Sequence, residues 1–369
     1  MGKVQFEEPL QFLHVVGFHP SIENKFSKIR KCLSPLIIAT LVIISLLELF
    51  VHFKGIETCS RASESLIVQY QVLHKFKVLL TYKSQMARLI ESSSKFWNLD
   101  SFDGRFKTEC GHIHTLLGRF FRVYKCMMLL MTLQYVLRKI IFKSDLPLAS
   151  TYGETQGFSP TVDLILFVFH CVATFTVLHV IIGFDGLFFY FIGHILSEVQ
   201  MLQSAFKIVQ FKDNDFVISI KHHQFVLSYI HNMNQVYSDL LLQQHLSCLF
   251  GICFGLFLLS EDGMPPDLSH MCKYIPYILS FTVQTFTFCV IGSLIISWTS
   301  EIADAIFYNG WDKSEAYGYK HEKMFAINRA QVATKLTLGG FGKLDLISFT
   351  LVVKNAYSFF TFINTIQDE

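Results

Sequence analysis

Seven long apolar runs constrain this chain more than any other feature of its sequence. An α-helix needs about 20 apolar residues to cross a hydrocarbon core about 30 Å thick. Runs near that length occur at 33–53, 65–82, 123–142, 163–183, 240–259, 274–298 and 344–366. The second is the least apolar, because it contains His74, Lys75 and Lys77. The sequence therefore predicts an all-α membrane protein with seven transmembrane helices.

Composition and the N-terminal segment agree with this interpretation. Only 16% of the residues are charged, against about 25% in soluble domains. Nucleic-acid-binding proteins usually have a large excess of basic residues, and the formal charge of +2 shows no such excess here. Residues 1–32 carry several charges before the first apolar run and show no cleavable signal pattern. We therefore expect the first crossing to remain in the mature protein.

The loops between the runs predict the orientation. Segments 1–32, 83–125, 205–238 and 300–343 hold 22 Lys and Arg together, whereas segments 54–64, 143–162 and 260–273 hold 4. Positive charge collects on the cytoplasmic side of a membrane. The pattern predicts a cytoplasmic N-terminus and an extracellular C-terminus. That orientation, and the absence of Asp-Arg-Tyr and Asn-Pro-x-x-Tyr motifs, argues against a G-protein-coupled receptor.

The predicted cytoplasmic segments look helical as well. Residues 184–205 continue the fourth apolar run, and residues 216–238 and 299–308 have a similar pattern. Apolar helix faces outside the bilayer must be buried against one another or against neighbouring subunits. No internal repeat divides the chain. We therefore expect a single domain over 1–369, with a cytoplasmic anchor formed from 184–238 and 299–343.

The last third carries a run of specific motifs. SEIADAIFYNGW begins at Ser300, a basic linker follows, and INRAQ leads to a Leu-x-x-Phe segment and the final apolar run. These motifs resemble the C-terminal signature of insect odorant receptors. The matching residues are Ala305, Ile306, Phe307, Tyr308, Trp311, Arg329, Ala330, Gln331, Tyr357, Ser358, Phe359, Phe360 and Thr361. Upstream, Asp185, Leu187, Phe188 and His194 match the family pattern after the fourth helix, and PLQFLHVVGFHP resembles its opening segment.

Two details favour a particular branch of that family. Related gustatory receptors tend to end in Thr-Tyr, five apolar residues and Gln-Phe, whereas Ser358 follows Tyr357 here and no Gln-Phe arrives. The long cytoplasmic insertion and Lys terminus of the shared co-receptor subunit are also missing. The chain thus resembles a ligand-tuning subunit. A gustatory-type channel that works without the co-receptor is the alternative.

The resemblance implies a function and partners. Members of the family form tetrameric cation channels whose last helix lines the pore, in the dendritic membrane of olfactory sensory neurons. A tuning subunit binds a volatile ligand and needs the co-receptor subunit to conduct. No cofactor or metal is implied. The residues expected in the assembly anchor are Asp185, Phe188, His194 and Trp311.

The pore helix would be 344–366. Phe362 and Ile366 are four residues apart, hence on one helix face, and match the family's hydrophobic gate, which closes by dewetting. Packing against lipid or a neighbouring helix is the plainer interpretation. Lys354 is an ionisable residue within a span, so it faces water or a partner such as Asp345. Asn355 and Ser358 would add polar lining.

The odorant pocket should lie in the outer half, between helices two, three, four and six. A volatile ligand needs an apolar and aromatic site with one or two polar groups. His74 and His170 are the polar groups we would expect to orient it, although simple packing is the better explanation for any single residue. The candidates, each set on one helical face, are Tyr70, Leu73, His74, Leu130, Gln134, Tyr135, Phe167, His170, Cys171, Thr174, Tyr277 and Phe281.

An enzyme is the remote alternative. Fifteen His are present, but the pairs His112/His114 and His222/His223 do not repeat at the spacing of a metal-binding His box. No P-loop, Gly-x-Ser-x-Gly or His-Glu-x-x-His motif occurs. The nine Cys include no CxxC pair, so neither a zinc site nor a disulfide framework is indicated. Cys59 and Cys272 alone would face outside, which leaves a disulfide between them open.

Overall fold

The described part of the chain is almost entirely helical, as predicted. The computed structural model describes residues 6–51, 55–97, 104–142, 159–208, 215–261, 263, 266–309 and 320–368. Its helices are α1 (Glu7–Val15), α2 (Lys25–Val51), α3 (Ile56–Thr81), α4 (Lys83–Ser92), η1 (Ser93–Lys95), α5 (Gly104–Phe142), α6 (Pro160–Ile208), α7 (Asp215–Ser260), α8 (Leu268–Phe307), α9 (Lys320–Gln331) and α10 (Leu346–Asp368). One short antiparallel hairpin, β1 (Thr337–Leu338) and β2 (Gly342–Lys343), precedes α10.

Six of these helices are long and apolar enough to cross a membrane: α2, α5, α6, α7, α8 and α10. The predicted crossing at 65–82 lies in α3, which is not among them. The reason is its polar content, since α3 carries Glu64 and Gln69 in addition to Lys75 and Lys77. The sequence predicts seven crossings, and the structure supplies six candidate spans among the residues that it describes.

Several helices are much longer than a bilayer is thick. At 1.5 Å per residue, the 49 residues of α6 extend for about 74 Å, against a hydrocarbon core of about 30 Å. The predicted crossing 163–183 and the predicted cytoplasmic segment 184–205 are therefore one continuous helix. The segments 216–238 and 240–259 are likewise both parts of α7. Half or more of each of these helices must project beyond the membrane.

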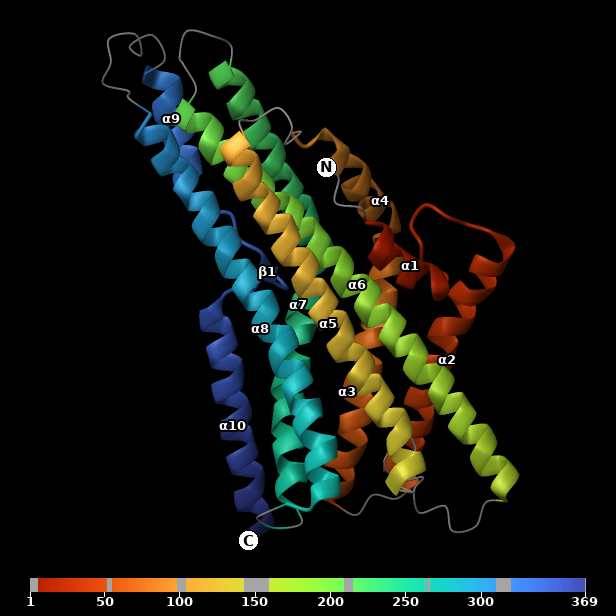
Figure 1. The fold of residues 1–369 in the computed structure, drawn as a ribbon. Coiled ribbons are helices and arrows are strands. Elements are labelled where there is room, and N and C mark those ends of the chain that lie inside the picture. Colours follow the sequence, from red (N-terminus) through yellow and green to blue (C-terminus); the bar gives the residue numbers. More distant parts are fainter. Residues whose placement is uncertain are drawn as a thin grey trace.

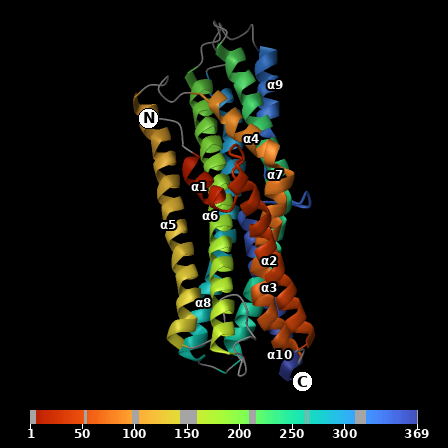
Figure 2. The same cartoon turned by 90° about the vertical axis from the view of Figure 1, so that its right-hand side faces the viewer.

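The long helices run side by side in an elongated bundle (Figures 1 and 2). α7 contacts α3, α6, α8 and α10, so it lies at the centre of the packing. α10 lies along the outside of the bundle, where its main contacts are with α7 and α8. The C-terminus lies at the end of the bundle where α8 begins, opposite α9 (Figure 1). We call these the C-terminal end and the α9 end.

The core centres on the middle of α6. Phe184, Phe188 and Phe189 are at most 1% exposed, and Phe188 lies against the rings of Tyr237 on α7 and Phe288 on α8 at 5.0 and 4.9 Å. Glycine allows close packing on the opposite side of the helix. A Cβ atom at Gly183 would lie 2.8 Å from the Leu13 side chain, so α1 can dock against α6 only because that position has no side chain.

A tight lead-in fixes the start of α10. Gly339 and Gly340 take positive φ angles of 59° and 81° in the hairpin turn, which side chains disfavour. Asp345 then caps the helix, because its Oδ1 accepts the Ser348 backbone N–H at 2.8 Å. A Cβ atom at Gly292 on α8 would lie 2.1 Å from the Leu344 carbonyl oxygen. The chain before α10 is therefore pressed directly onto α8.

Candidate functional site

The predicted pocket residues of α3 range from exposed to half-buried. Tyr70 is 60% exposed and its ring lies 6.3 Å from that of His74. Leu73 is half-buried and packs against the main core cluster. In this single chain the three residues form one stripe along α3, as their spacing predicts.

The α5 residues bridge two other helices. Leu130 is 67% exposed, but Gln134 donates a hydrogen bond to the Cys272 carbonyl oxygen on α8. Tyr135 donates its hydroxyl to Glu64 Oε1 on α3 at 3.4 Å. Two of the three predicted residues therefore join α5 to α3 and α8 near the C-terminal end of the bundle.

The α6 set includes one unpaired polar atom. Phe167 and Cys171 are half-buried, and Thr174 donates to the His170 carbonyl oxygen within its own helix at 2.7 Å. His170 is 1% exposed, and its Nδ1 has no hydrogen-bond partner among the described residues. A buried polar atom without a partner is uncommon, which keeps His170 a candidate for orienting a ligand.

The α8 residues pack towards α7 and α10. Tyr277 and Phe281 are both 3% exposed, with their rings 5.1 Å apart, and they share a cluster with Cys248 of α7 and Ala356 of α10. The Tyr277 hydroxyl donates to the Glu64 carbonyl oxygen at 3.4 Å. The structure thus brings Tyr135 and Tyr277 together around Glu64, but it does not bring Tyr70 or Leu130 to them.

Sequence analysis did not single out a charged pair at the same place. Glu64 and Lys273 are 6% and 8% exposed, and the Lys273 Nζ lies 2.8 Å from Glu64 Oε2. Arg61 forms a second ion pair with Glu261 at 3.0 Å. Both pairs join α3 to the start or the end of a neighbouring helix. The sequence shows Glu64 only as a charged residue beside the second apolar run, which does not indicate Lys273 as its partner.

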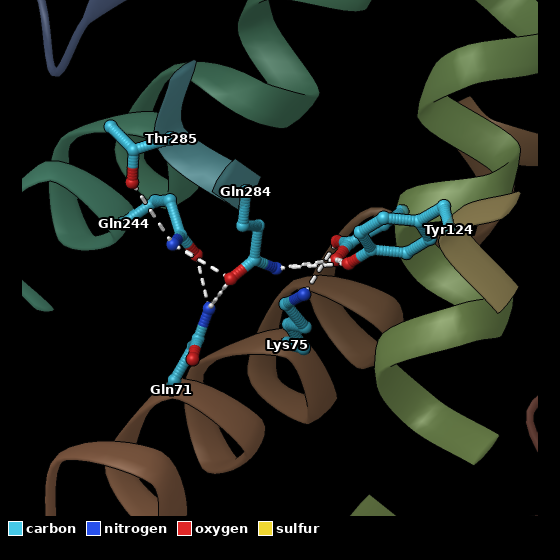
Figure 3. Close-up of polar contacts among 7 residues, drawn as sticks. Gln71, Lys75, Tyr124, Gln244, Gln284 and Thr285 are labelled. Atoms are coloured by element: carbon cyan, nitrogen blue, oxygen red, sulfur yellow. Dashed lines mark hydrogen bonds and ion pairs between the residues drawn. The ribbon is translucent and has the colours of Figure 1, made fainter. Parts of the chain in front are cut away.

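A larger polar cluster lies near the middle of the bundle (Figure 3). Asp185 of α6 accepts hydrogen bonds from Lys75 Nζ of α3 at 2.5 Å, Tyr124 of α5 at 2.7 Å and Gln284 of α8 at 2.6 Å. Sequence analysis placed Asp185 in the anchor and noted Lys75 only as a polar residue of the second crossing. Ionisable residues buried among membrane helices are rare and pair with one another. The presence of one basic and one acidic residue, Lys75 and Asp185, in apolar segments was therefore the sequence signal that could have predicted their pairing.

The predicted anchor residues lie inside one chain. Asp185 and Phe188 are at most 1% exposed, and His194 is 8% exposed and stacked on Phe6 with ring centroids 5.1 Å apart. These three side chains therefore pack within the single chain, and their part in subunit assembly stays a prediction. Trp311 lies outside the described residues. Cys59 and Cys272 are free thiols, so the structure does not contain the disulfide that the sequence left open.

α10 presents two different faces. Ala356 is fully buried, and Val352 and Val353 pack with it against α7 and α8. Phe362 and Ile366 are 62% and 47% exposed on the other side. The predicted pore-lining residues Lys354, Asn355 and Ser358 are exposed there too. Asp345 pairs with Lys343 at 3.0 Å, so Lys354 is left facing outwards rather than bonded to Asp345.

Comparison with known proteins identifies the family. The family model described as 7tm odorant receptor matches residues 56–357. Odorant receptor 98a of Drosophila melanogaster is 27% identical over 155 residues, which are 42% of this chain and 38% of that protein. Odorant receptor Or2 of Anopheles gambiae is 27% identical over 149 residues, 40% of this chain and 38% of that receptor. The chain therefore covers less than two-fifths of the length of either relative.

Solved structures extend the likeness over the whole fold. The insect olfactory receptor OR5 from Machilis hrabei in complex with eugenol superposes with a TM-score of 0.86 at 12% identity, covering 98% of this chain and 97% of that one. A second structure of OR5 from Machilis hrabei superposes with a TM-score of 0.81 at 13% identity, covering 97% of this chain and 96% of that one. The two comparisons confirm the resemblance seen in the C-terminal motifs: this multi-pass membrane protein belongs to the 7tm odorant receptor family of insects.

Proposed function

We propose that this chain is a ligand-tuning odorant receptor subunit that gates a non-selective cation current together with a co-receptor subunit. The observation that carries the proposal is the family match over residues 56–357. The fold shared with an olfactory receptor that binds eugenol supports it. The absence of the co-receptor's cytoplasmic insertion from this sequence favours the tuning role.

The proposed ligand site lies between α3, α5, α6 and α8 towards the C-terminal end of the bundle. Tyr135, Tyr277 and the Glu64–Lys273 pair supply polar atoms there, and His170 supplies an unpaired nitrogen. Apolar pockets with a few fixed polar groups select small ligands by orienting one functional group. We therefore expect volatile alcohols, phenols or esters rather than pure hydrocarbons.

The proposed pore is lined by the outward face of α10. That face carries the apolar pair Phe362 and Ile366 and, nearer the start of the helix, Lys354 and Asn355. A ring of such faces from four subunits would narrow to an apolar constriction that excludes water when closed. The predicted orientation places this constriction near the extracellular side.

Current recording in oocytes tests the proposal. Oocytes expressing this chain with an insect co-receptor are exposed to a panel of volatile alcohols, esters and phenols that includes eugenol. We expect inward cation current for at least one class, and none with either subunit alone. Current from this chain alone would instead favour the gustatory-type channel. Surface-labelled protein that never conducts with the co-receptor would contradict the proposal.

A further inference from the structure

Gln284 of α8 is the link between two buried polar groups (Figure 3). Its Nε2 donates to Asp185 Oδ2 at 2.6 Å and to the Tyr124 hydroxyl at 3.3 Å. Its Oε1 accepts hydrogen bonds from Gln71 at 3.2 Å and from Gln244 at 2.9 Å. One amide therefore connects the charged cluster of α3, α5 and α6 to an amide cluster shared by α3 and α7.

The side chains of the amide cluster also form hydrogen bonds with one another. Gln71 also donates to Gln244 Oε1, and Gln244 donates to Thr285 Oγ1 at 3.4 Å. All three side chains are at most 2% exposed, and Gln284 is 4% exposed. Polar groups buried this deeply lose their partners only at a cost, because no water replaces the broken bonds. We call Gln71, Lys75, Tyr124, Asp185, Gln244, Gln284 and Thr285 the mid-bundle network.

The mid-bundle network lies next to the start of α10. His245 follows Gln244 on α7, and its Nε2 lies 3.4 Å from both Ser348 Oγ of α10 and Cys289 Sγ of α8. Cys289 is also 3.7 Å from Ser348 Oγ. Ser348 belongs to the capping turn of α10, where its hydroxyl accepts the Asp345 backbone N–H at 3.2 Å. His245 and Cys289, which lie close to Gln244 and Gln284 on α7 and α8, thus contact the first turn of α10.

We propose that Gln284 is a positioning residue for gating, which couples α3, α5 and α6 to the first turn of α10 through the mid-bundle network. Three of the four helices proposed to hold the ligand meet at Asp185, and Gln284 belongs to the fourth. Movement of α3, α5 or α6 relative to α7 and α8 must shear the bonds of Gln284. The gating part of this inference rests on the proposed function, whereas the physical coupling to α10 does not.

The mechanism predicts a specific signature. A residue that only biases the closed–open equilibrium changes that equilibrium equally for every ligand, whereas a pocket residue changes ligands differently. Hydrogen bonds between membrane helices are worth factors of roughly three to ten in an equilibrium constant. Removing the Gln284 amide should therefore change the resting equilibrium by a factor in that range.

Gln243 provides a matched control. It lies beside Gln244 on α7 and is 5% exposed, but its amide donates to Ser247 of the same helix at 2.9 Å. Gln243→Leu removes a buried amide of equal size without cutting a bond between helices. Gln284→Leu and Gln243→Leu therefore differ in connectivity rather than in chemistry.

Hydrogen–deuterium exchange tests the coupling without any ligand. The purified full chain is compared in lipid nanodiscs as wild type, Gln284→Leu and Gln243→Leu. We expect peptides covering 344–352 to exchange roughly three to ten times faster in Gln284→Leu, and at the wild-type rate in Gln243→Leu. Equal exchange of these peptides in all three proteins overturns the inference.

Current recording with the co-receptor tests the gating part. We expect Gln284→Leu to raise the resting current and to lower the half-maximal concentration of every active alcohol, ester and phenol by one common factor. A double-mutant cycle with Ser348→Ala should be non-additive for Gln284→Leu and additive for Gln243→Leu. Different factors for different ligands would make Gln284 a pocket residue and overturn the proposal.

The exchange and current experiments distinguish a failure of the coupling from a failure of the proposed function and from a folding defect. Faster exchange at 344–352 without any wild-type odorant current would refute the proposed function and leave the coupling intact. If Gln284→Leu fails to fold, Gln71→Leu replaces it, because that change cuts the amide cluster and leaves all three donors on Asp185. If both fail to fold while Gln243→Leu folds, the network serves stability alone and the inference is wrong.

Discussion

Lys75 Nζ and Asp185 Oδ1 lie 2.5 Å apart on α3 and α6, and neither side chain has any exposed surface. Removing two charges from water costs several kcal/mol per ion, which their attraction offsets only with good geometry and further hydrogen bonds. Asp185 has those bonds, from Tyr124 and Gln284. The pair therefore fixes how α3 packs on α6 instead of simply adding stability.

This pair predicts an asymmetry between single and double variants. Lys75→Met or Asp185→Leu alone leaves a buried charge without its partner, so each should cost about 3–5 kcal/mol. The double variant removes both charges and should recover most of that loss. Thermal unfolding of the detergent-solubilised chain, followed by fluorescence size-exclusion chromatography, measures the order. A double variant no more stable than either single one would contradict the pairing.

Phe188 predicts a defect that precedes assembly. It is 1% exposed and packs on Tyr237 and Phe288, so Phe188→Ala should cost roughly 3–5 kcal/mol of packing. We expect the Phe188→Ala variant expressed alone to give a lower yield of folded, monodisperse protein than the wild type. Phe359→Ala is the matched control, since that side chain is 51% exposed in the single chain. Normal yield of Phe188→Ala with lost co-receptor binding would instead place Phe188 at a subunit contact.

The unequal distribution of basic residues predicts the orientation. An epitope after Glu369 should be labelled on intact cells, whereas one before Met1 should require permeabilisation, because the four predicted cytoplasmic segments hold most of the Lys and Arg. Immunofluorescence with and without detergent measures both. The reverse labelling would contradict the predicted topology.

The fold was largely predictable from the sequence because apolar length and periodicity determine membrane helices directly. The continuous helix α6 follows from a local pattern of this kind. α3 shows the limit, because its polar residues make it look like a poor membrane segment until their partners on other helices are known. Lys75 is stabilised by Asp185, which is 110 residues away along the chain. A single sequence does not show which distant residues form such ion pairs.

The candidate site was less predictable for the same physical reason. Spacing along one helix places Tyr70 and His74 on a common face, but only the packing of several helices decides whether that face points inwards. The sequence chose Tyr135 and Tyr277 separately, and the structure joins them through Glu64. Gln284 offered no local signal at all, since a single Gln within an apolar helix is equally compatible with lipid-facing and buried positions.

The last prediction concerns the gate and follows from the exposed face of α10. Phe362 and Ile366 are 62% and 47% exposed and lie one turn apart, whereas Ala356 of the same helix is buried against α7 and α8. An apolar constriction excludes water because its wall offers no hydrogen bonds, so a hydrated cation meets a dehydration barrier. Phe362→Ser or Ile366→Ser should wet that constriction and raise the resting current recorded with the co-receptor, and the half-maximal odorant concentration should change less than the resting current does.

A pocket variant supplies the opposite pattern and so tests the gate assignment. His170→Ala removes the buried nitrogen proposed to orient the ligand, and it should shift the half-maximal odorant concentration while the resting current stays near that of the wild type. The co-receptor contributes its own residues to a mixed pore, which reduces the size of the Ser effects without abolishing them. If both Ser variants conduct like the wild type while His170→Ala changes resting current or ion selectivity, the pore and pocket assignments are both wrong.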